Sequence, residues 1–364
     1  MIETTSKTSY NGNYGLNASW TIYNGSKRLN TIKQEKLNNQ AANLDVETSE
    51  NSIQESIAQI YIQILYAAES VKVNENTLQV SIAQRDRGQE LLNAGSMAKS
   101  DLAQLEAQVS TDRYQLVTAQ ATLQDYKLQL KQLLELDGEN EMNVYLPALS
   151  DENVLLPLPT KKDVYMSALT LRPEIEASKL SVEASELGID IAKAGYLPTI
   201  SLSAGIGTNH TSGSDFTFGE QVKNGWNNSI GLSISVPIFN NRQTKSAVEK
   251  AKLQYQTSQL TLLDEQKTLY KTIEGLWLDA NSAQQRYAAA VEKLRSTQTS
   301  YELISEQFNA GMKNTVELLT EKNNLLQAQQ ELLQSKYMAI LNTQLLKFYQ
   351  GDELTGLTAE NKNI

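Results

Sequence analysis

The sequence contains one long unit twice. The ten residues that begin at Gly15 match those that begin at Gly231, an offset of 231 − 15 = 216 positions. The tripeptide Asn-Ala-Gly ends at Gly95 and again at Gly311, which keeps the same offset. Distant landmarks at one fixed offset indicate an internal repeat, in which each copy forms one supersecondary unit. The fold is therefore expected to contain two equivalent pieces.

Each copy carries an apolar row with steps of four and three. The first row is Ile53, Ile57, Ile60, Ile64, Ala67, Val71, Asn74 and Leu78, and the second is Leu269, Ile273, Leu276, Ala280, Ala283, Tyr287, Ala290 and Leu294. This seven-residue period predicts helices that supercoil left-handed against partners. No proline interrupts 26–92 or 241–308, so each range predicts one helix roughly 100 Å long. A soluble coiled coil accounts for the rows equally well.

Shorter helices are expected to return along the long ones. The ranges 97–135, 173–194 and 314–349 predict helices of about 58, 33 and 55 Å. Between the first two lies a proline-containing segment with a short helix at 161–170, which we interpret as an insertion at mid-height. The predicted organisation of the single elongated protein, residues 1–364, is repeat one at 10–135, an equatorial insertion at 136–172, a return helix and β-hairpin at 173–240, repeat two at 229–349 and a tail at 350–364.

Three segments alternate apolar and small or polar residues, as strands with one apolar face do. The apolar positions are Tyr14, Leu16, Ala18, Trp20 and Ile22, then Ile200, Leu202, Ala204 and Ile206, then Ile230, Leu232, Ile234, Val236 and Ile238. Each segment has about ten residues, the length of a tilted transmembrane strand. A soluble sheet with one buried face has the same alternation. Three or four strands close no wide barrel, so an obligate oligomer is expected if the strands span a membrane.

Aromatic residues gather near the ends of these segments. They are Tyr10, Tyr14, Tyr23, Tyr196, Trp226 and Phe239. Aromatic residues form girdles at both membrane interfaces of outer-membrane barrels. The polar stretch 208–228 suits a long loop on the outer face of such a barrel.

Composition excludes several classes of function. The formal net charge is −10, with no basic stripe, so nucleic-acid binding is not expected. The chain has no cysteine and one histidine, His210, which we place in a surface loop, so neither a metal site nor a hydrolytic triad nor a cofactor is predicted. No run of about 18 apolar residues predicts a membrane helix. An enzyme is not expected.

Four sequence features together resemble the TolC-like outer-membrane efflux proteins. They are Arg172-Pro173-Glu174, the run Ala192 to Pro198, the run Val236 to Phe239, and the paired Asn-Ala-Gly tips. The resemblance implies a fold that is mainly α with transmembrane β: a homotrimer whose long coiled-coil hairpins form an α-barrel and whose strands share one outer-membrane β-barrel. It also implies a channel protomer of a tripartite efflux or type I secretion system. Only three of the family's four strands are recognisable, and the helix at 314–349 lacks an upper partner, so an N-terminally truncated member is expected.

The resemblance also implies roles for residues near the tips. Asp101, Lys313 and Glu317 match charged family positions at the periplasmic constriction, and Phe308 precedes the second tip glycine by three residues. We predict that Lys313 pairs with Asp101 in the closed state and that Glu317 rings the entrance. The predicted docking positions for an adaptor are Ala94, Gly95, Ala310, Gly311 and Met312.

Simpler interpretations of the same residues stay open. Acidic residues stabilise the first turn of any helix, and Asn314 with Glu317 fits a capping box. Phe308 is a candidate to pack the closed tip, but it continues the heptad, so the sequence favours plain packing between helices.

The expected partners are a periplasmic adaptor, which is a membrane fusion protein, an inner-membrane transporter of the RND or ABC class, and outer-membrane lipid. The alternative functions are a periplasmic adaptor, which would carry only one hairpin, and a coiled-coil scaffold, which would not need alternating strands.

Overall fold

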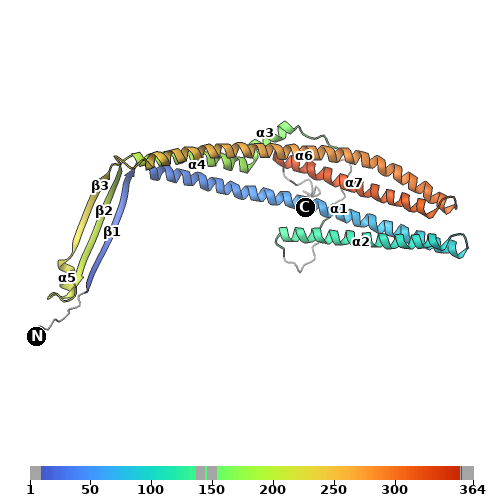
Figure 1. Ribbon diagram of the computed structural model, residues 1–364, viewed down its shortest axis with the longest axis horizontal. Coiled ribbons are helices and arrows are strands. Elements are labelled where there is room, and N and C mark those ends of the chain that lie inside the picture. The colour runs from blue at the N-terminus through green and yellow to red at the C-terminus, as the bar shows by residue number, and fades with distance from the viewer. Residues whose placement is uncertain (1–9, 137–143, 146–153, 353, 355–364) are drawn as a thin grey trace, which may run out of the picture. The chain divides into compact units, whose positions relative to one another are not determined.

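The computed structural model describes residues 10–136, 144–145, 154–352 and 354 (Figure 1). In chain order its elements are β1 (Asn11–Asn24), α1 (Lys27–Asn93), α2 (Lys99–Leu133), α3 (Lys161–Leu171), α4 (Pro173–Lys193), the 3₁₀ turn η2 (Ala194–Tyr196), β2 (Thr199–Thr211), α5 (Phe218–Asn224), β3 (Asn227–Ser235), α6 (Gln243–Asn309) and α7 (Thr315–Gln350). The long helices α1 and α6 each have 67 residues. The predicted helices at 26–92 and 241–308 therefore exist, with ends shifted by one or two residues.

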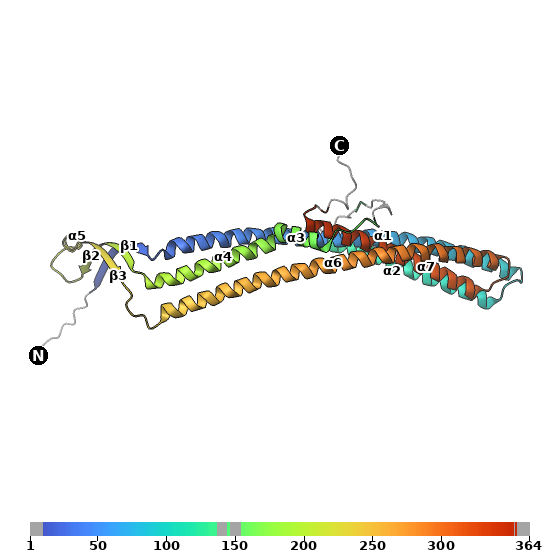
Figure 2. The same cartoon turned by 90° about the horizontal axis from the view of Figure 1, so that it is seen from above.

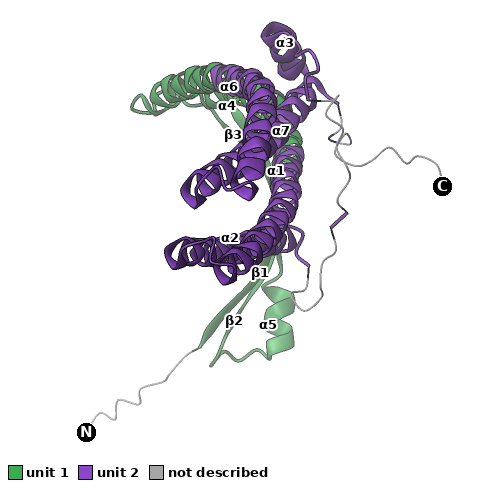
Figure 3. Cartoon of the chain, turned by 90° about the vertical axis from the view of Figure 1, so that its right-hand side faces the viewer, with its two compact units in different colours: residues 1–44, 176–264 green, residues 45–175, 265–364 purple. Residues whose placement is uncertain are grey.

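The chain divides into two compact units, coloured separately in Figure 3. Unit 1 comprises residues 1–44 and 176–264, and contains the three strands with parts of α1, α4 and α6. Unit 2 comprises residues 45–175 and 265–364. In unit 2, α2 runs back along α1 and α7 runs back along α6 (Figure 1, Figure 2). We call α1 with α2 the first hairpin and α6 with α7 the second hairpin.

The three strands form one antiparallel sheet in the order β1-β2-β3. Their register places the apolar residues opposite one another, because Trp20 pairs with Leu202 and Leu202 pairs with Leu232. The alternate positions bring together small polar residues, for example Ser19 with Ser203. Residues directly opposite in an antiparallel pair lie on the same face. The sheet thus has one apolar face and one polar face, as the alternation predicted.

Two details of the strands differ from the prediction. The pairing of β1 with β2 shifts between Thr21 and Tyr23, so Ile22 sits in a β-bulge and the alternation changes phase there. Strand β3 ends at Ser235, so Val236 and Ile238 lie outside it. Pro237 lies two residues beyond Ser235, and proline lacks the N–H that a continued ladder needs.

The predicted loop at 208–228 is more ordered than the sequence indicated. Strand β2 continues to Thr211 and includes His210, which was placed in a loop. Helix α5 then forms because Thr217 and Glu220 make a reciprocal capping box at its start. The side chain of Gln221 joins α5 to β2, since its Oε1 accepts from the backbone N of Thr211 at 2.8 Å.

Both long helices begin in the same unusual way. Gly25 and Ser26 precede α1 with φ of 66° and 65°, and Asn241 and Arg242 precede α6 with φ of 49° and 62°. These pairs occupy matching positions at the 216-residue offset. The left-handed conformation is costly for residues with a Cβ atom, so its recurrence shows that the two copies make the same strand-to-helix turn.

Unit 2 has a hydrophobic core that both hairpins share. Its buried members are Ala58, Ile62 and Leu65 of α1, Ala283 and Tyr287 of α6, Tyr337, Ala339, Ile340, Leu341 and Leu345 of α7, and Val154. Helix α1 therefore buries a second stripe beside the predicted row, of which Ile64, Ala67, Asn74 and Leu78 are buried. Ile53 departs from the row because its side chain is 47% exposed.

The described part of the predicted insertion is held on the helices of unit 2. Trp277 Nε1 donates to the carbonyl of Pro159 at 3.0 Å, and Gln284 Nε2 donates to the carbonyl of Leu156 at 2.8 Å. Residues 137–143 and 146–153 of that insertion lie outside the described residues, as do most residues of the predicted tail.

Arg172, the last residue of the predicted insertion, contacts residues of α1, α4 and α7. Its guanidinium pairs with Glu55 at 3.0 Å and Glu174 at 2.9 Å and lies 4.2 Å from the ring centre of Tyr349. Burial, with the charge of Glu55, raises the pKa of Tyr349 to about 12. Pro173 starts α4, where a missing N–H costs nothing.

Candidate functional site

Each hairpin ends in a tip with the same backbone. We define the first tip as residues 94–98 and the second tip as residues 310–314. At the first tip Gly95 has φ of 77°, its N–H bonds to Leu92 O at 3.0 Å, and Ser96 N bonds to Leu91 O at 2.8 Å. The second tip repeats this Schellman arrangement around Gly311, which has φ of 74°. Glycine is needed at both positions because the left-handed backbone disfavours a side chain.

Both tips are open on the outside. A Cβ atom added at Gly95 or Gly311 would meet nothing within 4 Å. Ala94 and Ala310 are exposed, and the side chain of Met312 is 69% exposed. The five predicted docking positions therefore form two unobstructed surfaces within the protomer.

The second tip has a capped start to its return helix. Asn314 Oδ1 accepts from the backbone N of Glu317 at 2.9 Å, and Glu317 Oε2 accepts from the backbone N of Asn314 at 3.2 Å. Lys313 Nζ bonds to Glu317 Oε1 at 2.5 Å. The hydrogen bond from Lys313, together with that from the Asn314 backbone, holds the pKa of Glu317 below its ordinary value.

The predicted pair of Lys313 with Asp101 concerns the closed state and stays a prediction, and within the protomer Lys313 has a different partner. Lys313 contacts Glu317 instead, because Glu317 lies four residues ahead and can be reached without crossing to the other tip. Asp101 lies in the first turn of α2, where its charge favours the positive end of the helix. The N-cap of α2 is Ala98, which makes no side-chain hydrogen bond. Phe308 is 8% exposed and is buried within the protomer.

The sheet in unit 1 exposes its apolar face. The exposed fractions are 84% for Ile230, 64% for Leu232 and 61% for Trp20. The other face carries Asn, Ser, Thr and Gly in all three strands and, among the described residues from Asn13 to Thr21 and their partners, no charged side chain. An apolar face of this extent is unusual on a protein in water and marks a membrane or protein contact.

Aromatic side chains border the sheet. The five predicted interface residues are all exposed, namely Tyr14, Tyr23, Tyr196, Trp226 and Phe239. The sequence interpretation missed Phe216 and Phe218, which lie just before and at the start of α5 and are 58% and 56% exposed. The ring of Phe218 contacts the edge of Tyr14, with 6.4 Å between ring centres. The Thr217-Phe218-Gly219-Glu220 capping pattern is the signal that could have located this helix.

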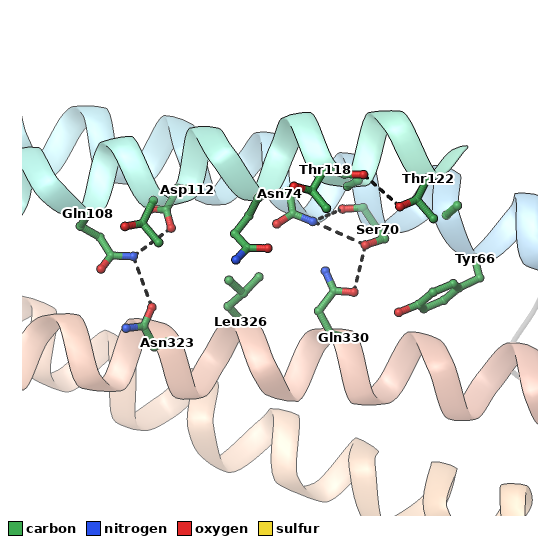
Figure 4. A pocket seen from close by; sticks show the side chains of 14 residues that line it. Tyr66, Ser70, Asn74, Gln108, Asp112, Thr118, Thr122, Asn323, Leu326 and Gln330 are labelled. Carbon is green, nitrogen blue, oxygen red and sulfur yellow. Dashed lines mark hydrogen bonds between the residues drawn. The ribbon is translucent and has the colours of Figure 1, made fainter. Parts of the chain in front are cut away.

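A polar groove of about 360 Å³ lies in unit 2 between α1, α2 and α7 (Figure 4). Ser70 Oγ donates to Gln330 Oε1 at 3.0 Å at one end, and Gln108 Nε2 lies 3.4 Å from Asn323 Oδ1 toward the other. Hydroxyl and amide side chains line most of it, and Asp112 is its one charged residue. This groove was not predicted, because its residues come from three helices that are far apart in sequence.

In the described part of the chain, no helix combines the length and the apolarity needed to cross a bilayer. Within the same residues, no group of His, Cys, Asp and Glu side chains has the arrangement of a metal site.

Known proteins resemble this chain in sequence and in fold. The sequence model of the outer membrane efflux protein family matches residues 2–135 and 164–351. The chain is 23% identical over 333 residues to the outer membrane efflux protein BepC of Brucella suis, which covers 91% of this chain and 70% of BepC. It is 26% identical over 344 residues to outer membrane protein TolC of Escherichia coli, which covers 90% of this chain and 66% of TolC.

Solved structures share the fold. The crystal structure of CusC matches with a TM-score of 0.81 at 19% identity, over 95% of this chain and 83% of that one. The structure of VceC from Vibrio cholerae matches with a TM-score of 0.77 at 16% identity, over 95% of this chain and 88% of that one. The predicted fold class is confirmed by these matches. Because the family match covers both hairpins and the strands, the chain belongs to the outer membrane efflux protein family, as a channel protein of the outer membrane.

Proposed function

We propose that the chain is one protomer of a homotrimeric export channel. The observation that carries this proposal is the sheet, whose apolar face is exposed on all three strands while its polar face is small and uncharged. Lipid on one side and water on the other satisfy both faces. Within the described residues β1 and β3 are unpaired at their outer edges, and several copies of the chain would pair those edges and close a barrel.

The tips are the proposed contact with a periplasmic adaptor. Support comes from the open space around Gly95 and Gly311 and from the exposure of Met312. An adaptor would link the tips to an inner-membrane transporter of the RND or ABC class. The exported substrate stays open, since among the relatives AprF is named for alkaline protease secretion and CusC for cation efflux.

The constriction of the channel is also proposed to lie at the tips. Glu317 would face the entrance together with Lys313, whose bond to Glu317 in the protomer offsets part of the acidic charge. In the assembled channel Lys313 could exchange this bond for one to Asp101. The capping role of Glu317 is compatible with this proposal, because its Oε1 binds Lys313 while its Oε2 binds the helix start.

Conductance across a lipid bilayer tests the proposal. We expect the detergent-extracted protein to run as a trimer and to open channels in planar bilayers. The variant Lys313→Glu should raise the preference for cations, as measured by the reversal potential in a salt gradient, whereas Lys252→Glu, on an exposed part of α6, should leave it unchanged. A monomer that is soluble without detergent and gives no channels would favour the adaptor or the scaffold instead.

Docking is tested separately. Gly311→Trp should abolish crosslinking of the second tip to an adaptor while trimers persist. Gly213→Trp, at another left-handed glycine with open space, is the matched control. Crosslinking that survives Gly311→Trp would contradict docking at this tip.

A further inference from the structure

A buried ion pair links the two hairpins of unit 2. Lys322 of α7 donates to Asp112 of α2 and to the hydroxyl of Ser81 of α1, and Ser81 also donates to Asp112. The side chains of Lys322 and Asp112 are 4% and 2% exposed. We call these three residues the Lys322 cluster. Gln108 extends it, because its Nε2 donates to Asp112 Oδ1 at 2.9 Å and lies near Asn323.

The cluster is not a product of the repeat. At the 216-residue offset, Ser81 and Asp112 correspond to Thr297 and Ala328, and Lys322 corresponds to Glu106. Thr297 bonds within its own helix, to the carbonyl of Lys293, and Ala328 is fully buried. The charged contact therefore exists only where α7 meets the first hairpin.

The burial of this ion pair restricts how α7 can pack against the first hairpin. Removing two charges from water is costly, so such a pair adds little net stability compared with apolar residues of similar volume. What it does supply is a single permitted arrangement, because any slip of α7 would leave a buried charge without a partner. Burial lowers the pKa of Lys322, although Asp112 opposes this effect.

The contacts between the hairpins change on the side of the cluster nearer the tips. Gln84 Nε2 donates to Tyr301 Oη at 2.9 Å, which joins α1 to α6 at about the level of the cluster. Beyond Gln84, Gln108 and Tyr301, in the described residues up to both tips, no side-chain hydrogen bond or ion pair joins the two hairpins. The ion pairs found there, such as Lys313 with Glu317, stay within one hairpin.

We propose that the Lys322 cluster is a pivot: it fixes the second hairpin on the first at this level, and the tips move relative to each other about it. Packed helices move by hinge and shear about contacts that persist, and a buried pair that permits one register is such a contact. The inference concerns the protomer and does not depend on whether the chain assembles into a channel.

Spin labels measured by pulsed electron paramagnetic resonance test the pivot. The chain has no cysteine, so labels can be placed without background. One pair, at Thr111 and Asn324, lies on exposed positions next to the cluster, and a second pair, at Ser96 and Met312, lies on the tips. We expect a narrow distance distribution for the first pair and a broad one for the second. Equal widths in the labelled, otherwise unchanged chain would overturn the proposal.

Variants of the cluster sharpen the test. Lys322→Met combined with Asp112→Leu removes both charges, and should broaden the Thr111–Asn324 distribution until it resembles that of the tips while helical circular dichroism is kept. The matched control is Lys293→Met with Glu331→Leu, which removes an exposed pair between α6 and α7 of one hairpin and should change neither distribution.

The charge-reversed variant covers the case in which the apolar variant fails to fold. Lys322→Asp with Asp112→Lys keeps a paired arrangement and should keep the narrow distribution. A folded apolar variant that stays narrow, or a folded charge-reversed variant that becomes broad, would contradict a pivot made by this ion pair. Loss of bilayer conductance with unchanged distances would count against the proposed channel and not against the pivot.

Discussion

The two tips share a backbone and differ in how the next helix begins. Gly95 and Gly311 have nearly the same φ, and both tips close with the same pair of backbone hydrogen bonds. The N-cap of α7, Asn314, belongs to a complete capping box, whereas the N-cap of α2, Ala98, makes no side-chain hydrogen bond. The two copies thus share the glycine and the hydrogen bonds that the turn requires. A helix cap contributes only about 1 kcal/mol and can differ between copies.

Away from the tips, the two hairpins also differ in the residues at matching positions. Gly88 of α1 allows Leu105 of α2 to approach, since a Cβ at Gly88 would lie 2.6 Å from Leu105 Cδ1. The second hairpin has Ile304 and Glu321 at the matching positions. This contact of a glycine with a leucine therefore belongs to the first hairpin alone.

The largest expected effect comes from Gly88→Ala. Leu105 is 1% exposed, so overpacking against it should cost about 1 to 3 kcal/mol, against about 1 kcal/mol gained from helix propensity. Thermal unfolding followed by circular dichroism should show a lower midpoint. The control is Gly275→Ala in α6, where a Cβ meets nothing within 4 Å and the midpoint should rise. Equal shifts in both variants would show that the two hairpins pack alike.

Alanine at the tip glycines should have the next largest effect, and the same effect at both tips. Gly95→Ala and Gly311→Ala should each cost about 1 to 2 kcal/mol, because the left-handed backbone disfavours a Cβ and no clash adds to it. Amide hydrogen exchange at each tip measures the local cost. Unequal values would mean that the tips share less than their backbone hydrogen bonds indicate.

The caps should respond in opposite directions. Asn314→Ala should destabilise the start of α7 by about 1 kcal/mol, and Ala98→Asn should stabilise the start of α2 by no more than about that amount. Hydrogen exchange of the first-turn amides measures both changes. If Ala98→Asn gives no added protection, the first tip differs in more than its missing cap.

The smallest expected effect is the loss of stability at low pH. The pKa of Glu317 is lowered in the folded chain, first by the hydrogen bond from Lys313, so the stability that it contributes is present above its ordinary pKa and is lost as the pH falls through the lowered value. Nuclear magnetic resonance titration should place the Glu317 midpoint below 4.5, and Lys313→Gln should move it upward. Lys99→Gln, on the first tip's return helix, should leave that midpoint in place. An unchanged midpoint in Lys313→Gln would assign the shift to the Asn314 backbone alone.

Local patterns predicted most elements of the fold. The proline-free heptad stretches located α1 and α6, and alternation located the faces of the sheet, since a period of seven or two reports one surface of one element. The bulge at Ile22 was missed because apolar and polar residues alternate in the sequence through this position, whereas the pairing of β1 with β2 shifts there. Helix α5 was missed because it has only seven residues, too few to show a helical period, and lies within a polar stretch.

The candidate sites divide along the same line. Sequence alone determined the repeat, the two tips, the strand faces and the charged residues near Gly311, because each depends on neighbours within a few residues or on the copy 216 positions away. The meeting of Ser81, Asp112 and Lys322, which come from three different helices, is visible only in the tertiary structure. A heptad pattern predicts that a helix packs against a partner helix. It does not predict which helix is the partner or in which register the two pack. Both depend on how buried charges such as Lys322 and Asp112 are paired, which is a property of several helices together.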